Sequence, residues 1–227
     1  MAQQRPGTSR KIEVAPQRLV GWIDSFGERH GGAMTAHAAA DAVLFAAADG
    51  AQARCLAPFP PLRAIDDGDP RSLAGLLAEH ATAERTVGVL LVRLGGYAAG
   101  VFTGTEPVLA ASKVGSRLVH GRSAAGGTSQ RRFARRRENQ AHQALAAAAD
   151  TAAAVFAPYR LDAVVLGGDR RSVAGLRADP RLAGYFELAV DAFLTVPDPR
   201  LTVLRDTPRL FRAIRITLSE PEPAEPD

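Results

Sequence analysis

The stretch Gly121-Arg-Ser-Ala-Ala-Gly-Gly-Thr-Ser-Gln-Arg-Arg-Phe-Ala-Arg-Arg-Arg137 decides how the rest of the chain is interpreted. An apolar strand is predicted to end near Val119, just before it. A loop of small residues follows and contains the paired glycines Gly126 and Gly127. Glycine permits a tight turn and a close approach of the backbone to another molecule. A long helix is then predicted from about Ser129 to Ala157.

The charge of this region has one sign. Between Pro107 and Arg137 there is no Asp or Glu, and the Lys and Arg side chains sum to +8. The whole chain carries a net charge of only +4, so the remainder carries about −4. One basic surface on an otherwise mildly acidic protein is the expected footprint of a polyanionic partner.

The spacing of the arginines sharpens this interpretation. Arg131, Arg132, Arg135 and Arg136 repeat with helical spacing and therefore share one face of the predicted helix. The apolar stripe that predicts packing on the body begins only later, with Ala141, Leu145, Ala148, Ala152, Val155 and Phe156. We therefore expect the first turns of the helix to project from the body into a space lined by nucleic acid.

The surrounding sequence predicts a sheet with helices. Three strand signals separated by short turns predict an antiparallel meander. Further along, the apolar run Leu161–Leu166 predicts a strand that is buried on both faces. The predicted elements are strands at Thr86–Leu94, Tyr97–Thr103, Val108–Val119, Leu161–Leu166, Phe193–Val196 and Ala213–Leu218, with helices near Arg170–Arg177 and Leu182–Asp191.

The first third of the chain predicts a smaller α+β region. Pro16 opens a short helix with Trp22 as a core anchor, and the helix ends at Gly31-Gly32. Val43–Leu56 predicts a hairpin around Asp49-Gly50, with a helix as the alternative because of its alanines. A helix is predicted for Pro70–Ala83.

Composition limits the chemistry that is available. Cys55 is the only cysteine, which excludes a disulfide within the chain and favours a reducing, cytoplasmic setting. The five histidines lack metal-ligand spacing, and no nucleophile elbow occurs. The Gly-Gly-Asp at 167–169 lacks the Lys-Ser/Thr of a nucleotide-binding loop, which favours simple turn geometry. We therefore expect no cofactor and no metal.

No apolar run is long enough to cross a membrane, and the polar start is not a signal peptide.

The central stretch resembles the peptidyl-tRNA hydrolysis loop and following helix of the eukaryotic and archaeal class-one release factors. It is still more similar to the VMS-like release factors (VLRF), which act in the rescue of stalled ribosomes. The actinobacterial-type branch of that family carries Gly-Gly-x-Ser-Gln-x-Arg-Phe-Ala-Arg-Arg-Arg, matched here by residues 126–137. The resemblance covers roughly Arg85 to Val196. In the ordinary release factors Gln directly follows the two glycines, whereas Thr128 holds that position here and Gln130 lies two residues later.

This resemblance implies an α+β fold whose main part is a ribonuclease H-like mixed sheet of the release-factor central-domain type. It also implies a peptidyl-tRNA hydrolase whose loop enters the peptidyl transferase centre of the large ribosomal subunit. Gln130 would promote attack of water on the peptidyl-tRNA ester, with Gly126 and Gly127 as its hinge. The side chains expected to contact the phosphates of ribosomal RNA and tRNA are Arg122, Arg131, Arg132, Arg135, Arg136 and Arg137.

The expected organisation has four parts. Residues 1–10 are predicted to be disordered, 11–83 to form the small N-terminal α+β region, 84–218 to form the catalytic domain, and 219–227 to be an acidic, proline-rich tail. Nothing in residues 1–83 resembles a codon-reading domain, so codon-independent release is expected. The partners would be the ribosome and peptidyl-tRNA, with a monomer off the ribosome and no membrane.

Three alternatives stay open. The first is a non-catalytic ribosome- or tRNA-binding factor, which the offset of Gln130 from the glycines favours. The second is a nuclease acting on the 3′ end of tRNA, although the basic loop lacks the clustered carboxylates of such enzymes. The third is a general DNA-binding protein.

Overall fold

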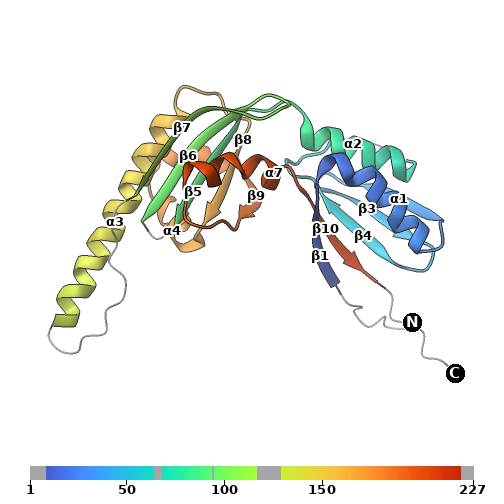
Figure 1. Cartoon of the computed structure of the whole chain (residues 1–227), viewed down its shortest axis with the longest axis horizontal. Helices are drawn as coiled ribbons and strands as arrows, with labels where there is room; N and C mark the ends of the chain where they lie inside the picture. The colour runs from blue at the N-terminus through green and yellow to red at the C-terminus, as the bar shows by residue number, and fades with distance from the viewer. Residues whose placement is uncertain (1–8, 64–67, 94, 117–128, 221–227) are drawn as a thin grey trace. The chain divides into compact units, whose positions relative to one another are not determined.

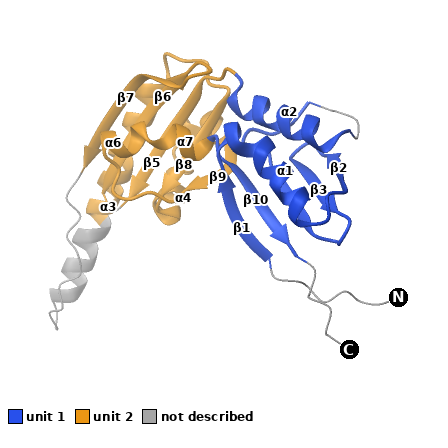
Figure 2. Cartoon of the chain, turned by 45° about the vertical axis from the view of Figure 1, so that its right-hand side comes forward, with its two compact units in different colours: residues 1–83, 212–227 blue, residues 84–211 orange. Residues whose placement is uncertain are grey.

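Two compact units make up the chain, residues 1–83 with 212–227 and residues 84–211 (Figure 2). The computed structural model describes residues 9–63, 68–93, 95–116 and 129–220, and in the range 129–138 it describes the backbone only. Both units combine a sheet with helices, so the predicted α+β class is confirmed.

Within the described residues, the first unit is a five-stranded antiparallel sheet in the order β1-β10-β4-β3-β2 (Figure 1). Helices α1 and α2 pack against each other and against the sheet, where Leu19, Phe26 and Leu77 enter the core. The elements are β1 (Ser9–Val14), η1 (Pro16–Arg18), α1 (Leu19–Arg29), β2 (Met34–Ala38), β3 (Ala42–Ala47), β4 (Gln52–Leu56), α2 (Pro70–Thr82) and β10 (Ile214–Ser219).

The β3–β4 hairpin forms as the turn residues predict. Gly50 has a φ of +93°, the left-handed conformation that glycine adopts without strain. The Asp49 carboxylate accepts a hydrogen bond from the Ala51 backbone N–H at 2.9 Å, which closes the turn. The helical alternative for this alanine-rich segment is therefore wrong.

The described part of the second unit is a five-stranded mixed sheet in the order β7-β6-β5-β8-β9. The predicted antiparallel meander is confirmed in β5–β6–β7, while β8 pairs in parallel with both β5 and β9. The elements are β5 (Val87–Arg93), β6 (Gly96–Thr103), β7 (Val108–Ser116), α3 (Ser129–Phe156), β8 (Ala163–Gly168), α4 (Arg170–Leu176), η2 (Pro180–Leu182), α5 (Ala183–Glu187), β9 (Ala189–Leu194), α6 (Leu201–Arg205) and α7 (Thr207–Phe211).

Helices cover both faces of this second sheet. Consecutive residues of a strand point to opposite faces. On β6, Val101 packs into the core beneath α3 and α4, whereas the ring of Phe102 meets that of Phe211 from α7 at 5.9 Å. The predicted burial of the fourth strand is confirmed, because residues 163–167 of β8 are buried.

The structure corrects several predicted boundaries. Ser9 and Arg10 belong to strand β1, so the disordered segment predicted for 1–10 is wrong at its last two residues. The helix predicted up to Asp191 ends at Glu187, and strand β9 begins earlier than predicted, at Ala189. Strand β2 and the short helices α6 and α7 were not predicted.

The largest correction concerns β10. The sequence interpretation assigned residues 213–218 to the catalytic part 84–218, but β10 pairs with β1 and β4 in the first sheet. The pairing of β1 with β10 joins residues about two hundred positions apart in the chain, and no local pattern reports it. Ser219, predicted to open the acidic tail, is the last residue of this strand.

Candidate functional site

The carboxyl ends of four strands meet at one edge of the second sheet. β5, β8 and β9 are parallel, and β7 runs with them because both β5 and β7 are antiparallel to β6. Strand β7 ends at Ser116, paired with Gly96 at the start of β6. The chain therefore leaves this edge directly before residues 117–128 and returns as helix α3 (Figure 1).

Helix α3 divides into two parts along its 28 residues. On the described side chains, burial begins at Ala144 and continues through Ala148, Ala152 and Phe156. Residues 139–143 are exposed or only partly buried. The segment 129–143 would extend for roughly 22 Å at 1.5 Å per residue. Figure 1 shows the start of α3 standing beyond the end of the sheet, as predicted from the late apolar stripe.

The predicted site residues fall at this projecting end or just before it. Gln130 and the arginines of the predicted RNA-contacting face lie on the first turns of α3, where only the backbone is described. Gly126, Gly127 and Arg122 lie outside the described residues. Their catalytic and RNA-binding roles therefore stay predictions.

The junction between β8 and α4 lies at the same edge. Gly168 has a φ of +99°, and a methyl group there would stand 2.2 Å from the carbonyl oxygen of Val92. The Asp169 backbone N–H donates to that same carbonyl at 2.8 Å. Gly168 is therefore required by the turn, which supports the turn interpretation of the Gly-Gly-Asp sequence.

Asp169 is the N-cap of α4. Its carboxylate accepts hydrogen bonds from the side-chain O–H of Ser172 at 2.7 Å and from the backbone N–H of Ser172 at 2.9 Å. The pKa of Asp169 lies below its ordinary value, mainly because of the bond from the Ser172 side chain and next because of the bond from the Ser172 backbone. The carboxylate therefore stabilises the start of α4.

An ionic cluster joins the packed half of α3 to the segment that contains η2. Arg181 of η2 reaches Asp150 of α3 at 2.7 Å and Asp179 at 2.6 Å. The hydrogen bonds from Arg181 lower the pKa of Asp179, and the two carboxylates raise the pKa of Arg181. These are surface pairs of small net energy. They indicate the register of α3 against the following segment rather than a reaction centre.

Two histidines of the first unit have structural partners. His30 Nδ1 lies 2.7 Å from Asp49 Oδ2, and His80 Nε2 lies 2.7 Å from the carbonyl oxygen of Phe59. Burial raises the pKa of the Cys55 thiol to about 12, so it is not a thiolate nucleophile at neutral pH. Among the described residues, no group of three or more His, Cys, Asp and Glu side chains is placed to hold a metal ion.

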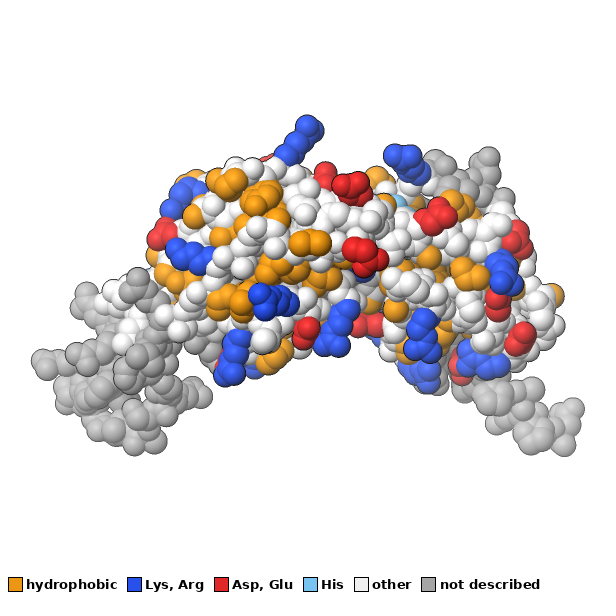
Figure 3. Space-filling model, turned by 45° about the horizontal axis from the view of Figure 1, so that its top comes forward, with side chains coloured by type: hydrophobic (Ala, Val, Ile, Leu, Met, Phe, Trp, Pro, Cys, Tyr) orange, Lys and Arg blue, Asp and Glu red, His pale blue; other side chains and the backbone are white. Residues whose placement is uncertain are grey.

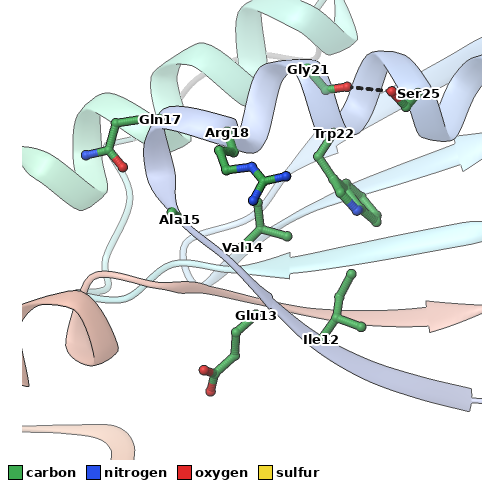
Figure 4. A pocket seen from close by; sticks show the side chains of 9 residues that line it. All are labelled: Ile12, Glu13, Val14, Ala15, Gln17, Arg18, Gly21, Trp22 and Ser25. Carbon is green, nitrogen blue, oxygen red and sulfur yellow. Dashed lines mark hydrogen bonds between the residues drawn. The ribbon is translucent and has the colours of Figure 1, made fainter.

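A groove of about 560 Å³ lies between β1 and α1 of the first unit (Figure 4). Trp22 lines it and stacks on Phe26 with ring centroids 5.7 Å apart. Trp22 is only partly buried, so its predicted role as a core anchor is correct only in part. The groove is lined by Ile12, Glu13, Val14, Ala15, Gln17, Arg18, Gly21, Trp22 and Ser25. Sequence reasoning did not find it, because β1 was not predicted.

Positive and negative side chains are mixed on the face of the molecule that Figure 3 shows. On the face shown in Figure 3, Lys and Arg side chains stand mostly apart and are interspersed with acidic and hydrophobic ones. The long acid-free run of positive charge lies in the sequence at residues 107–137. In the described part of the chain, no helix is long and apolar enough to cross a membrane.

These features define a class. The second unit is an α+β protein in which a mixed sheet carries, at one edge, a glycine-rich sequence followed by a long helix with an arginine-rich start. Residues 85–217 match the family model described as Actinobacteria/chloroflexi VLRF1 release factor. This match spans more than half of the 227-residue chain. The chain belongs to this family of release factors.

Comparison with solved structures gives weaker similarities. The crystal structure of the archaeal translation termination factor aRF1 aligns with a TM-score of 0.42 and 11% identity, over 89% of this chain and 64% of that one. A second archaeal protein aligns with a TM-score of 0.34 and 13% identity, over 90% and 65%. The chain thus spans somewhat less than two thirds of either protein, and neither similarity carries an argument about function. No curated protein sequence matches the chain.

Proposed function

We propose that this chain is a codon-independent peptidyl-tRNA hydrolase that releases nascent chains from stalled ribosomes or large ribosomal subunits. The observation that carries the proposal is the family match over residues 85–217, which includes both the Gly-Gly-x-Ser-Gln sequence and helix α3. Its partners would be large-subunit ribosomal RNA and peptidyl-tRNA, its setting the cytoplasm, and its state off the ribosome a monomer.

The proposed reaction needs few side chains of the protein. Peptidyl-tRNA is already an activated ester, so the enzyme must place a water molecule and stabilise the oxyanion that forms. Backbone N–H groups and one neutral amide can do both. Gln130 supplies a donor and an acceptor without charge, and Gly126 and Gly127 allow close approach.

The arrangement of α3 supports delivery of this group. The helix packs on the sheet only from Ala144 onward, and its start stands beyond the sheet edge. A segment of that kind suits a narrow site inside a large RNA assembly. Arg122, Arg131, Arg132, Arg135, Arg136 and Arg137 would seat it against phosphates, so binding should weaken steeply with salt.

For the second unit we propose a ribonuclease H-like sheet of the release-factor central-domain type. The order β7-β6-β5-β8-β9, with an antiparallel meander followed by parallel strands, supports this assignment. We further propose residues 84–211 as the catalytic domain. They differ from the predicted 84–218 by the strand that joins the first sheet.

A release assay tests the proposal. Purified large subunits carrying peptidyl-tRNA would be incubated with the full chain, and both the peptide and the tRNA length would be followed on one gel. We expect free peptide together with full-length tRNA. Shortened tRNA would instead identify a nuclease acting on the 3′ end. Co-sedimentation without release would support the non-catalytic binding factor, for which the displaced Gln130 is the favouring feature.

A further inference from the structure

Helices α3 and α4 lie side by side and run in the same direction. Each follows a strand that ends at the loop-bearing edge, α3 after β7 and α4 after β8, and each leads back toward the opposite edge. One contact between the two helices indicates their register, and one from the following helix η2 agrees with it. A methyl group on Gly175 would lie 2.9 Å from Leu145 Cδ1, and Arg181 Nη1 lies 2.7 Å from Asp150 Oδ1.

This register places the start of α4 beside the point where α3 leaves the body. The two contacts join residues separated by 30 and 31 positions in the chain. By the same offset, Arg170 and Arg171 stand level with residues 140 and 141 of α3. The arginine-rich turns end at Arg137, about 4.5–6 Å further along the helix axis. The two α4 arginines therefore lie on the body of the domain, beside the turn of α3 that follows the arginine-rich sequence.

Lys113 stands on the other side of α3. In the sheet it pairs with Ala99, whose side chain belongs to the core beneath α3. Directly paired residues share a face of the sheet, so Lys113 points to the α3 side. Helix α3 contacts β5, β6 and β7, and on its other flank it contacts α4. Lys113 and the two α4 arginines thus bracket the root of the projecting helix.

These three cations are available to a partner. All are exposed, and within the described residues no salt bridge joins any of them to a carboxylate. The guanidinium of Arg170 lies 4.3 Å from the centroid of the Phe193 ring, which restrains it without neutralising it. Asp169, which precedes Arg170 in the chain, has a carboxylate that already accepts two hydrogen bonds from Ser172. These three exposed cations form the basic surface that is called the collar below.

We propose that Lys113, Arg170 and Arg171 form a basic collar that binds RNA phosphates beside the root of α3. This inference rests on the proposed function and adds to it a second phosphate-binding surface on the domain body. Guanidinium groups suit this role because they bind phosphate oxygens in a bidentate manner. The phosphates belong either to ribosomal RNA or to the acceptor arm of the tRNA.

The test uses the full chain and two matched variants. In R170Q/R171Q both collar arginines of α4 are neutralised. In R177Q the arginine at the far end of the same helix is neutralised, and its guanidinium is likewise stacked on an aromatic ring, 4.7 Å from the centroid of Phe186. Thermal unfolding of both variants checks that the fold is retained. Binding to purified large subunits and to free tRNA is then measured over a range of salt concentrations.

We expect R170Q/R171Q to bind large subunits at least about tenfold more weakly and to reduce the slope of log affinity against log salt by about 2, while R177Q changes neither. A matching loss on free tRNA would assign the phosphates to tRNA, and a loss on large subunits alone would assign them to ribosomal RNA. Unchanged binding by R170Q/R171Q, or an equal loss in R177Q, would overturn the collar.

The failure of the collar and the failure of the proposed function are separable. If the wild-type chain releases peptide and R170Q/R171Q binds large subunits as tightly as wild type, the collar fails and the hydrolase proposal stands. If the wild-type chain released no peptide while R170Q/R171Q still lost affinity, the hydrolase proposal would fail and the collar would stand.

Discussion

The two sheets of this chain contain the same number of described strands but differ in the relative directions of those strands. In the first sheet every neighbouring pair is antiparallel, so successive strand ends alternate between opposite edges. In the second, β5, β7, β8 and β9 all end at one edge. Loops from separate parts of the sequence therefore gather there. The comparison teaches that topology places the candidate site, as is general for sheets with parallel strands.

The most drastic way to test this comparison is to remove the strand that returns to the first sheet. A chain ending at Phe211 lacks β10, so β1 loses its partner and the core loses Ile214, Ile216 and Leu218. We expect the first unit to lose its folded structure while the second retains it. Amide hydrogen exchange should show lost protection in β1 and β4 and retained protection in β5 and β8. Protection retained everywhere, or lost everywhere, would contradict the division into units.

A smaller but still large effect is expected at the edge of the second sheet. Gly168→Ala would place a methyl group 2.2 Å from the Val92 carbonyl oxygen at a positive φ. We expect a loss of about 3 kcal/mol or more in the free energy of unfolding, measured by denaturant titration. Gly184→Ala is the control, because no atom lies within 4 Å of the added methyl group. Equal effects of the two substitutions would show that the edge is not closely packed.

The cap of α4 should give the smallest effect, with a defined pH dependence. Asp169→Ala removes two hydrogen bonds at the helix start and should cost about 1 kcal/mol at pH 7. The pKa of Asp169 is lowered by folding, so its contribution is present above about pH 3.8 and is lost as the pH falls through the folded value. The free energies of unfolding of wild type and variant should therefore become equal below the folded pKa of Asp169. A difference that persists in strong acid would contradict this account.

Much of the second unit could be predicted because its signals are local. Short turns separate the apolar runs of the meander, and the late start of the apolar stripe on α3 indicated a projecting helix. Strand β1 escaped prediction because Ser9, Arg10 and Lys11 are polar and exposed at the edge of the sheet. Its stability comes from pairing with β10, a contact that no local pattern encodes.

The candidate site could be predicted in part from sequence. The acid-free, arginine-rich stretch and its resemblance predicted a site at residues 126–137; the family match covers this range, and the roles of its residues stay predictions. The collar could not be found in that way. Lys113 lies on β7 whereas Arg170 and Arg171 lie on α4, and only the strand register and the packing of α4 beside α3 bring them to the same edge.

The central claim is that Gln130 promotes hydrolysis of the peptidyl-tRNA ester. The most direct test is the single-turnover rate of peptide release from purified large-subunit complexes at saturating protein, with wild type, Gln130→Ala and the control Gln143→Ala compared. Gln143 lies on the same helix and is exposed. We predict that Gln130→Ala slows release by about 100- to 1000-fold without weakening binding, while Gln143→Ala behaves as wild type. Release by Gln130→Ala at the wild-type rate would contradict the assignment.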